Sequence, residues 1–578
     1  MMDFVITDQR QRYLDSRGKV IVNACPGSGK TTSVAYKLKN LLEYWDFKYS
    51  GVACISFTNV AKDEINEKFY DFTGKSISYP HLVSTIDSFI NQYITLPHFH
   101  LLGYKTRPTI LEDYSLLDSF SPYALNKYKI NNRPILYMYK PSKIDVAADG
   151  SYLFDGNKPK LIEENLITFK NYCVALKRMQ FQKGILKNSD SLYLALKILR
   201  ENPGVAKQLS SRFRYLIIDE AQDTSEIQHL IINELINNGL EHVELIGDPY
   251  QSLYEWREAR PDLFTDKTKS PDWNFLTMSE CRRSVLPIVK AYSIFRLKEH
   301  DDLYSSQSDV EQSPIHLIYY NKLNDLVSKY EELSSRFNNN IVLVRGKTLL
   351  QELKAMPNDK NHWSESPFSP IHFIHAKSDM EHGQTKEAIK RIYKLIPVLF
   401  DPSLKENPSK KREFLEANND NYELKSKIIL LIKNLPVFDL TLTEWTRDLN
   451  ELCKNIFDLA QSPTFILKQG KYRPDHNKKI EEMYQQPENF SKVTTIHKVK
   501  GKTFDSIMLV LSPNSSGQNI SLNDFKKPLQ MPDEKKRMLY VAMSRPKWQL
   551  VLAVPSQNRL TDEQEIRMFG SKPIVHVI

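Results

Sequence analysis

The chain has few cysteines, no long apolar run near its N-terminus and no repeat of fixed period. Its cysteines include no Cys-x-x-Cys pair, which argues against a disulfide framework and a zinc site and fits a reducing cytoplasm; they are Cys25, Cys54, Cys173, Cys281 and Cys453. The sequence predicts no signal peptide and no membrane-spanning segment. We therefore expect a cytoplasmic protein with no membrane partner.

The chain also has little excess charge. Its net charge is +9, from 79 Lys and Arg against 70 Asp and Glu. This excess is small for 578 residues, so charge alone permits a polyanionic partner without indicating one. Hydrophobic residues make up 41% of the chain, enough for true cores. At roughly 100–200 residues per domain, the length predicts several domains.

A glycine-bearing loop stands between an apolar segment, VIVNA, and a helical pattern, SVAYKLKNLL. It is close to the Walker A pattern G-x-x-x-x-G-K-[ST], with Ala at the first position. Glycines let backbone N–H groups converge on phosphate oxygens, and the following helix adds its positive end. Lys30 would reach the β- and γ-phosphates, and Thr31 would bind Mg²⁺. The predicted nucleotide site comprises Ala24, Cys25, Pro26, Gly27, Ser28, Gly29, Lys30, Thr31 and Thr32.

Two adjacent acids follow the apolar residues YLII at 215–218. Asp219 is expected to hold Mg²⁺ through water. Glu220 is expected to polarise the attacking water as a general base. A solvated acidic turn after a strand is the alternative interpretation, but the glycine loop in the same chain favours the hydrolytic one.

Short apolar segments alternate with helical stretches along the chain. This βα alternation predicts parallel sheets. One set of predicted strands begins at residues 20, 52, 215 and 243, and a second set begins at 341, 506 and 550. Two separate sheet cores are therefore expected.

The string DEAQD at 219–223, with further motifs in the same order, resembles the UvrD/PcrA/Rep family of superfamily 1A DNA helicases from about residue 6 to 555. The resemblance implies an α/β fold: two RecA-like parallel-sheet motor domains with two largely helical insertions, 1B and 2B. It implies ATP and Mg²⁺ as cofactors. The expected boundaries are 1–89 and 196–280 for 1A, 90–195 for 1B, 281–352 and 483–578 for 2A, and 353–482 for 2B.

The resemblance also assigns roles around the nucleotide. Gln11 would read adenine, with Gln9 as the alternative. Gln251 would sense the γ-phosphate, and two arginines would reach it from the second motor domain. Cys281 and Arg282 stand where the family more often has Asn and Tyr. The expected catalytic residues are Lys30, Asp219, Glu220, Gln251, Arg283 and Arg545.

Other motifs of the family contact single-stranded DNA. Aromatic side chains would stack on bases of any sequence, at roughly 1–3 kcal/mol each. Asp87 stands where the family commonly has His. The expected DNA-binding residues are Phe57, Asn59, Ser88, Tyr254, Trp256, Arg257 and His497.

These features imply an ATP-dependent translocase or helicase, 3′→5′ by family resemblance, acting on single-stranded and tailed duplex DNA. Compact chains with ACPGSGKT-type and GKTFD-type motifs resemble helicase components of Gabija-type anti-phage systems, whose partner is an OLD-like, Toprim-bearing nuclease. An ATP-gated DNA-binding regulatory subunit and a housekeeping repair helicase are the alternatives. A small-molecule P-loop kinase would not require Gln251 or Trp256. We expect no nuclease site in this chain, and only a last strand and a short tail after Arg545.

Overall fold

The computed structural model describes residues 4–114, 116–119, 123–253, 259–297, 303–307, 315–323, 325–353, 361–364, 368–381, 385–405, 408–418, 421–459, 465–484, 493–517, 519–569 and 572–578. The chain divides into two compact units. One unit is residues 346–494, and the other contains everything before and after them. Within the described ranges, no helix has both the length and the apolar character needed to cross a membrane.

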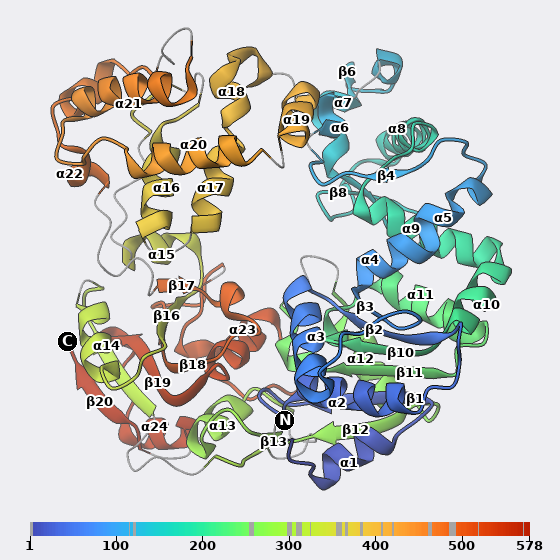
Figure 1. Ribbon diagram of the computed structural model, residues 1–578. Helices are drawn as coiled ribbons and strands as arrows, with labels where there is room; N and C mark the ends of the chain where they lie inside the picture. Colours follow the sequence, from blue (N-terminus) through green and yellow to red (C-terminus); the bar gives the residue numbers. More distant parts are fainter. Residues whose placement is uncertain are drawn as a thin grey trace. The chain divides into compact units, whose positions relative to one another are not determined.

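The larger unit contains a first six-stranded sheet in the order β12-β1-β11-β10-β2-β3 (Figure 1). Every strand pairing in it is parallel. Its strands are β1 Lys19–Ala24, β2 Gly51–Ser56, β3 Leu82–Thr85, β10 Phe213–Asp219, β11 His242–Gly247 and β12 Asn274–Met278. Four of these coincide with the strands predicted at 20, 52, 215 and 243.

Helices cover both faces of the first sheet. Along β1, Ile21 packs into one apolar core, while Val20 and Val22 pack into the core on the other face. A strand buried on both faces reads as a continuous apolar run, which is why VIVNA shows no polar alternation. The surrounding helices are α1 Asp8–Asp15, α2 Lys30–Glu43, α3 Asn59–Thr73, α4 Ile86–Ile90, α9 Asn188–Glu201, α10 Pro203–Arg212, α11 Glu226–Asn237 and α12 Pro261–Thr268.

The larger unit also contains most of a second six-stranded sheet, in the order β17-β16-β18-β19-β15-β20, whose strand β17 includes the residues at which the two units meet in sequence. The pairings from β16 to β20 are parallel. Its strands are β15 Ile315–Tyr320, β16 Asn340–Val344, β17 Val493–Thr495, β18 Phe504–Val510, β19 Pro546–Pro555 and β20 Ile574–Val577. The neighbouring elements are β13 Glu280–Cys281, β14 Tyr304–Ser305, α13 Leu286–Ser293, α14 Leu326–Ser334, α23 Glu534–Met543 and α24 Asp562–Phe569. The predicted α/β class with two parallel-sheet motor domains is confirmed.

The expectation of a short tail after the last strand was wrong. Residues 562–569 form α24, and β20 pairs with β15, placing Ile574 beside His316. Phe569 at the end of α24 is 1% exposed and packs into the core of the second sheet. The segment is structural because Phe569 fills part of that core and the backbone of β20 pairs with the edge of β15.

The inserted segment 90–195 is built around the 20-residue helix α8 Glu163–Gln182. It also contains three short strand pairs that we did not predict: β4–β9, β5–β6 and β7–β8. Its elements are α5 Leu96–His98, β4 Thr109–Ile110, α6 Leu116–Ser119, β5 Lys129–Ile130, β6 Arg133–Pro134, α7 Ile135–Met138, β7 Ile144–Val146, β8 Tyr152–Phe154 and β9 Ile185–Leu186.

The smaller unit is largely helical over its described residues. Trp363 and Trp445 lie at the centre of its own apolar core, with ring centroids 5.8 Å apart. Its helices, after α15 Lys347–Leu353, are α16 Ile371–Glu381, α17 Thr385–Tyr393, α18 Ile396–Phe400, α19 Pro408–Ala417, α20 Tyr422–Lys433, α21 Leu442–Phe457 and α22 Ile480–Tyr484. The exact boundaries of the four predicted domains remain predictions.

Candidate active site

The glycine loop connects β1 to α2 and is packed tightly on both sides. Gly27 has φ 75° and Gly29 has φ 78°, a left-handed backbone that glycine adopts at little cost. A Cβ on Gly27 would come within 2.6 Å of the Cβ of Arg283. Arg283 follows the first sheet in sequence and precedes the second. The loop therefore touches an arginine that belongs to the other half of the predicted site.

Hydroxyl and carboxylate oxygens suited to Mg²⁺ meet at the start of α2. The Oγ1 of Thr31 lies 3.2 Å from Oδ2 of Asp219. Mg²⁺ usually binds one or two protein oxygens and completes its shell with water and substrate phosphates, so these two residues fit it. Nowhere in the described ranges do three or more His, Cys, Asp or Glu gather as a metal cluster.

Glu220 is held in a strained position at the end of β10. Its φ is 55°, which costs energy for a residue with a Cβ and is found at functional sites. Its Oε2 accepts a hydrogen bond of 2.6 Å from Gln222, and its Oε1 lies 3.6 Å from Nζ of Lys30. Gly247 makes room for this arrangement, since a Cβ there would meet Gln222 at 2.2 Å.

The two neighbouring acids are placed in different electrostatic environments. Burial and the adjacent Glu220 raise the pKa of Asp219. Burial also opposes ionisation of Glu220, but Lys30 and Lys500 outweigh it and hold the Glu220 pKa below its ordinary value. Glu220 is thus a carboxylate at neutral pH, the form that can accept a proton.

Arginine side chains enter the site from the second sheet and from the segment that joins the two sheets. Arg545, which follows α23, is 2% exposed and donates a hydrogen bond of 2.7 Å from Nη2 to Oε1 of Gln251. Gln251 in turn donates to Asp248 at 2.8 Å. Arg283 donates to the carbonyl oxygen of Ser544 at 3.1 Å. Burial and the nearby Arg283 lower the pKa of Arg545 to about 9, so a negative charge placed between the two arginines would be strongly favoured.

Three polar contacts that the sequence did not reveal join the same two halves. Asp248 accepts a hydrogen bond of 3.1 Å from the hydroxyl of Tyr540 and lies 3.7 Å from Arg296. Lys500 forms a buried ion pair with Asp223. Burial raises the pKa of Asp223 to about 6 although Lys500 opposes the shift. These contacts join residues 248 and 540, or 223 and 500, and only the folded chain reveals them.

Residues 25–32 of the loop, Glu220, Gln251 and both arginines line one cavity of about 410 Å³. Phe57, which we predicted for DNA binding, also lines it. The cavity includes the side chains of Lys498, Lys500 and Lys502, so cations surround it on the side of the second sheet. It is therefore suited to an anionic ligand shared by both sheets.

Two family models match the chain. The UvrD/REP helicase N-terminal domain matches residues 5–272, and the UvrD-like helicase C-terminal domain matches residues 179–557. The second match alone covers well over half of the chain. The chain belongs to the UvrD-like helicase family. Members of this family are ATP-dependent DNA helicases.

Several curated relatives of this UvrD-like helicase have related sequences. YjcD of Bacillus subtilis (strain 168), assigned as an ATP-dependent DNA helicase, is 21% identical over 96% of this chain and 79% of its own length. The ATP-dependent DNA helicase Rep of Escherichia coli (strain K12) is 24% identical over 50% of this chain and 42% of its own length. A DNA helicase II homolog of Mycoplasma capricolum subsp. capricolum is 24% identical, over 53% of this chain and 43% of its own length. The matches to the last two thus span less than half of those relatives.

The end of the site at which we predicted adenine binding contains an arginine that we did not predict. Gln9 accepts a hydrogen bond of 2.8 Å from the backbone of Ser279. The exposed Gln11 donates to Asp15 at 2.8 Å. Between them, Arg10 is buried and donates to the carbonyl oxygen of Ser28 in the glycine loop at 2.6 Å. Which glutamine reads adenine remains a prediction, while Arg10 positions the loop.

The predicted DNA-binding residues of the UvrD-like helicase are only partly described. Tyr254, Trp256 and Arg257 lie outside the described residues. Ser88 accepts a hydrogen bond of 2.8 Å from Thr85, and Asn59 begins α3 on the surface. His497 lies 4.0 Å from Glu534; because burial lowers its pKa, His497 is neutral at pH 7 and the contact is not an ion pair. Their roles remain predictions.

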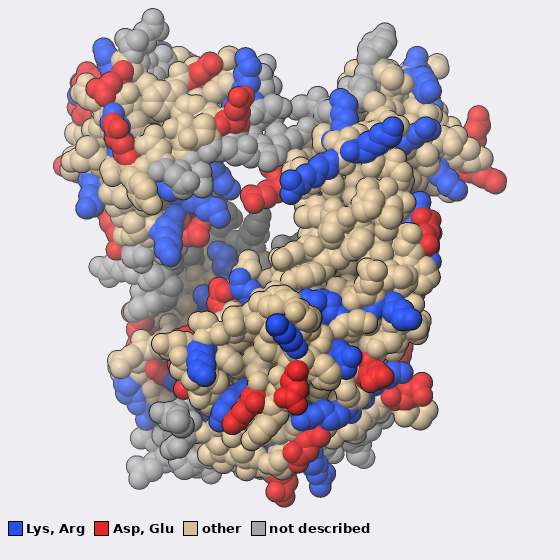
Figure 2. All heavy atoms as spheres, turned by 45° about the vertical axis from the view of Figure 1, so that its right-hand side comes forward, with Lys and Arg blue, Asp and Glu red and all other residues tan. Residues whose placement is uncertain are grey.

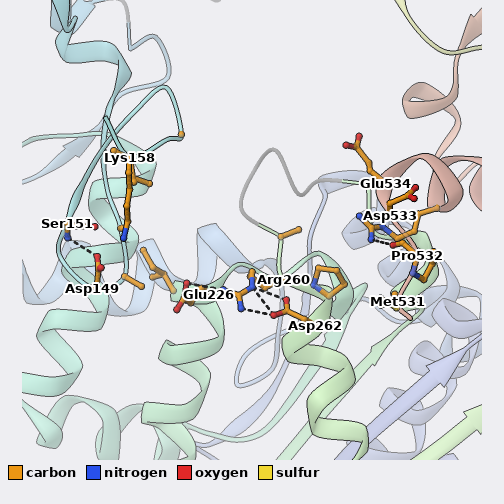
Figure 3. A pocket seen from close by; sticks show the side chains of 18 residues that line it. Asp149, Ser151, Lys158, Glu226, Arg260, Asp262, Met531, Pro532, Asp533 and Glu534 are labelled. Atoms are coloured by element: carbon orange, nitrogen blue, oxygen red, sulfur yellow. Dashed lines mark hydrogen bonds and ion pairs between the residues drawn. The ribbon is translucent and has the colours of Figure 1, made fainter. Parts of the chain in front are cut away.

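A second cavity of about 800 Å³ lies between the start of α11 and α12, residues 147–158 and the start of α23 (Figure 3). Arg260 donates to Asp262 at 2.6 Å and lies 3.2 Å from Glu226. Its lining has more acids than bases, with Asp149, Glu226, Asp262, Asp533 and Glu534 against Lys158, Arg260 and Arg537. This excess of acids makes the cavity less suited to an anionic ligand than the first one.

Proposed function

We propose that this chain hydrolyses ATP to move 3′→5′ along single-stranded DNA and to separate the strands of a tailed duplex. The observation that carries the proposal is the single cavity lined by Lys30 and Glu220 from the first sheet and by Arg545 from the second. One ligand bound there contacts both sheets. Its hydrolysis would remove the shared contact.

The side chains divide the chemistry of hydrolysis. Lys30 neutralises phosphate charge, and Glu220, held ionised beside it, accepts a proton from the attacking water. Arg283 and Arg545 stabilise charge that develops on the γ-phosphate, as arginine fingers do. Mg²⁺, held by Thr31 and Asp219, supplies further charge neutralisation when bound.

Movement follows from differential binding. Gln251 contacts Arg545 across the two halves of the site, so loss of the γ-phosphate changes a contact that both sheets share. A ligand that binds the closed arrangement better shifts the population toward it. Among the described candidates, Phe57 follows β2 and Ser88 lies in α4, which follows β3, so each closure would move them relative to a bound strand.

The test compares ATP hydrolysis with and without single-stranded DNA, followed by strand separation on duplexes of equal sequence with a 3′ or a 5′ tail. We expect stimulation by DNA and separation of the 3′-tailed duplex only. Separation of the 5′-tailed duplex alone would show that the chain moves 5′→3′. Tight DNA binding and ATP hydrolysis without movement or strand separation would instead favour the ATP-gated regulatory subunit.

We also propose a cytoplasmic role in phage defence with a partner nuclease of the OLD-like, Toprim-bearing type. Support comes from the glycine loop ACPGSGKT and the string GKTFD, which resemble such helicase components. The test is phage infection of cells carrying the chain with its neighbouring genes. If cells are protected from phage by the parent chain but not by the Lys30→Ala variant, the result supports a role in defence. Unchanged infection together with sensitivity to DNA damage on deletion would favour a housekeeping repair helicase.

A further inference from the structure

A third cavity, of about 640 Å³, lies wholly within the inserted segment 90–195 and the adjoining start of α9. It opens between α8, α9, residue 152 and residues 102–106. Four aromatic rings line it, from Tyr104, Tyr152, Phe181 and Tyr193. This volume is typical of sites for small organic groups. Neither the nucleotide cavity nor the acidic cavity of Figure 3 shares any of these residues.

The rings form a partly open platform. Tyr104 stacks on Phe99 with centroids 4.9 Å apart and an interplanar angle of 22°, and it meets Phe181 edge-on at 5.9 Å. Tyr104, Tyr152 and Tyr193 all remain partly exposed. Burial, with neighbours that include Tyr193 and Tyr104, raises the pKa of Tyr152 to about 12. The three tyrosines therefore gather around one space and keep ring surface available for a ligand.

Cations surround this platform, and none of the described residues that line it is an acid. Lys105, Arg178 and Lys197 are exposed at the cavity. Within the described part of the chain, Lys105 and Arg178 form no ion pair and no hydrogen bond, and Lys197 has only an exposed contact with Glu201 at 3.7 Å. Burial raises the pKa of Tyr104 while Lys197 and Arg178 act against that shift, which places both charges near its hydroxyl.

The cationic character extends beyond the cavity. Residues 90–195 hold 14 Lys and Arg against nine Asp and Glu, an excess of +5 in a chain whose total is +9. Figure 2 shows a run of Lys and Arg side chains across this insertion at the upper right, with few Asp and Glu among them. Exposed lysines outside the cavity include Lys158, Lys160 and Lys170. The surface thus suits a chain of phosphates better than one isolated anion.

We propose that this cavity binds one unpaired nucleotide of a DNA strand. Its base stacks on the tyrosine platform, and its phosphate is contacted by Arg178, Lys105 and Lys197. Aromatic stacking accepts every base, so the site has no sequence preference. The proposal rests on the proposed DNA function, because it adds a second DNA contact remote from the nucleotide site.

A DNA strand fits this cavity better than a free nucleoside polyphosphate. Polyphosphates are commonly cradled by converging backbone N–H groups of glycine-rich loops, as at residues 24–32. The third cavity instead has side-chain cations on an open rim. These are sufficient to bind the single negative charge of one phosphodiester. The buried Lys177 cannot assist, because it is paired with Asp190 at 2.6 Å.

The experiment uses the full chain, a forked duplex with unpaired thymidine tails on both strands, and one fixed salt concentration. Binding is followed by fluorescence anisotropy. Arg178→Glu and Tyr104→Ala should each weaken binding about tenfold, the size expected from one stacked base or one lost phosphate contact. The matched controls Lys129→Glu and Tyr137→Ala, which alter exposed residues of the same insertion outside the cavity, should stay within about twofold of the parent chain.

A second readout locates the contact. Tails that contain 5-iododeoxyuridine should cross-link, on irradiation, to peptides holding Tyr104, Tyr152 or Tyr193, and Arg178→Glu should abolish the cross-link. Unchanged affinity in both variants, or no cross-link in these peptides, would overturn the proposal. So would competition for the cross-link by free thymidine monophosphate as strong as that by the oligonucleotide.

The outcome is separable from the proposed motor function. At saturating DNA, the cavity variants should retain DNA-stimulated ATP hydrolysis within about twofold, because no cavity residue lines the nucleotide site. A parent chain whose ATP hydrolysis ignores DNA would contradict the motor while the anisotropy and cross-linking still report on the cavity.

Discussion

The two parallel sheets of this UvrD-like helicase have the same number of strands but bring different chemistry to the cavity between them. The first sheet supplies the glycine loop with Lys30 after β1, and Glu220 after β10. The second supplies Arg545, with Arg283 from the segment that joins the two. Under the proposed function, the first half would bind the phosphates and the second would sense the γ-phosphate, so substitutions in each half should have different effects.

The largest effects should come from the first sheet. Lys30→Ala should leave no measurable ATP hydrolysis, because phosphate charge loses its main neutraliser. Glu220→Gln should keep ATP binding but lose about 10²–10⁴ in turnover, the usual contribution of a general base. Steady-state hydrolysis and equilibrium binding of a labelled ATP analogue measure both, with the exposed Glu43→Gln as control. Near-normal turnover in Glu220→Gln would remove Glu220 from the chemistry.

The next effect should come from the arginines. Arg283→Ala and Arg545→Ala should each reduce turnover at least about a hundredfold with a smaller change in ATP binding, because fingers act on transition-state charge. Arg559→Ala, an exposed arginine after β19, serves as control. If both variants hydrolyse ATP at the parent rate, the second sheet has no part in catalysis.

A smaller effect should separate DNA binding from ATP chemistry. Trp256→Ala should leave basal ATP hydrolysis largely intact and weaken single-stranded DNA binding by roughly 1–3 kcal/mol, equally for different base sequences. Trp256→Phe should recover part of this loss because a ring remains. Titrations with oligonucleotides of different composition measure it, and a strong sequence preference in the parent chain would exclude a grip based on stacking.

Low pH should destabilise the protein through a buried histidine beside the first sheet. His229 in α11 is 2% exposed, and burial, with nearby Lys267, lowers its pKa to about 3. Below pH 6.5 the unfolded chain binds a proton that the folded chain does not, so stability falls as pH falls. The free energy of unfolding should therefore be about 1.4 kcal/mol lower at pH 5.5 than at pH 8.

Denaturant unfolding of the parent chain and His229→Leu at both pH values measures this loss. The variant should be less sensitive to acid than the parent. His316 in β15, whose pKa burial lowers to about 4, offers a comparison in the second half, since it has hydrogen-bonding partners in His576 and Gln549. Equal acid sensitivity of the parent and His229→Leu would show that His229 is not the responsible group.

No effect at all is expected in a nuclease assay. The purified chain with Mg²⁺ and ATP should leave circular single-stranded and plasmid DNA uncut, because we assign its acids at the cavity to ATP hydrolysis. Cleavage should appear only with a second protein. Metal-dependent cleavage by the chain alone that survives Glu220→Gln would reveal a second active site.

Local patterns in the sequence were sufficient for much of this fold. The strands VIVNA, YLIID and SIMLVL are continuous apolar runs because both faces of each sheet are covered. The strands β3, β12, β15 and β20 were not predicted, since LVST and NFLTM mix polar residues into short runs and IHLIYY carries a histidine. The loop at residues 24–32 was recognisable because its function depends on adjacent residues.

Contacts between residues far apart in the sequence could not be predicted from local patterns. Arg10 beside Ser28, Lys500 beside Asp223 and Tyr540 beside Asp248 each join segments that only folding brings together. Motif order pointed to Gln251 and Arg545 individually, but the 2.7 Å bond between them is a property of the assembled cavity. The same holds for the tyrosines of the third cavity, which come from residues 104, 152 and 193.

The position of β20 bears on how the chain folds during synthesis. The first sheet has all its strands once residue 278 has emerged, whereas β15 must wait for β20, which begins at residue 574. At roughly 5–20 residues per second, a ribosome needs about 10–50 s to translate the interval. During that time the apolar edge of β15 is unpaired and open to aggregation. A slow-translating host or a stalled ribosome would therefore endanger the second half of the motor far more than the first.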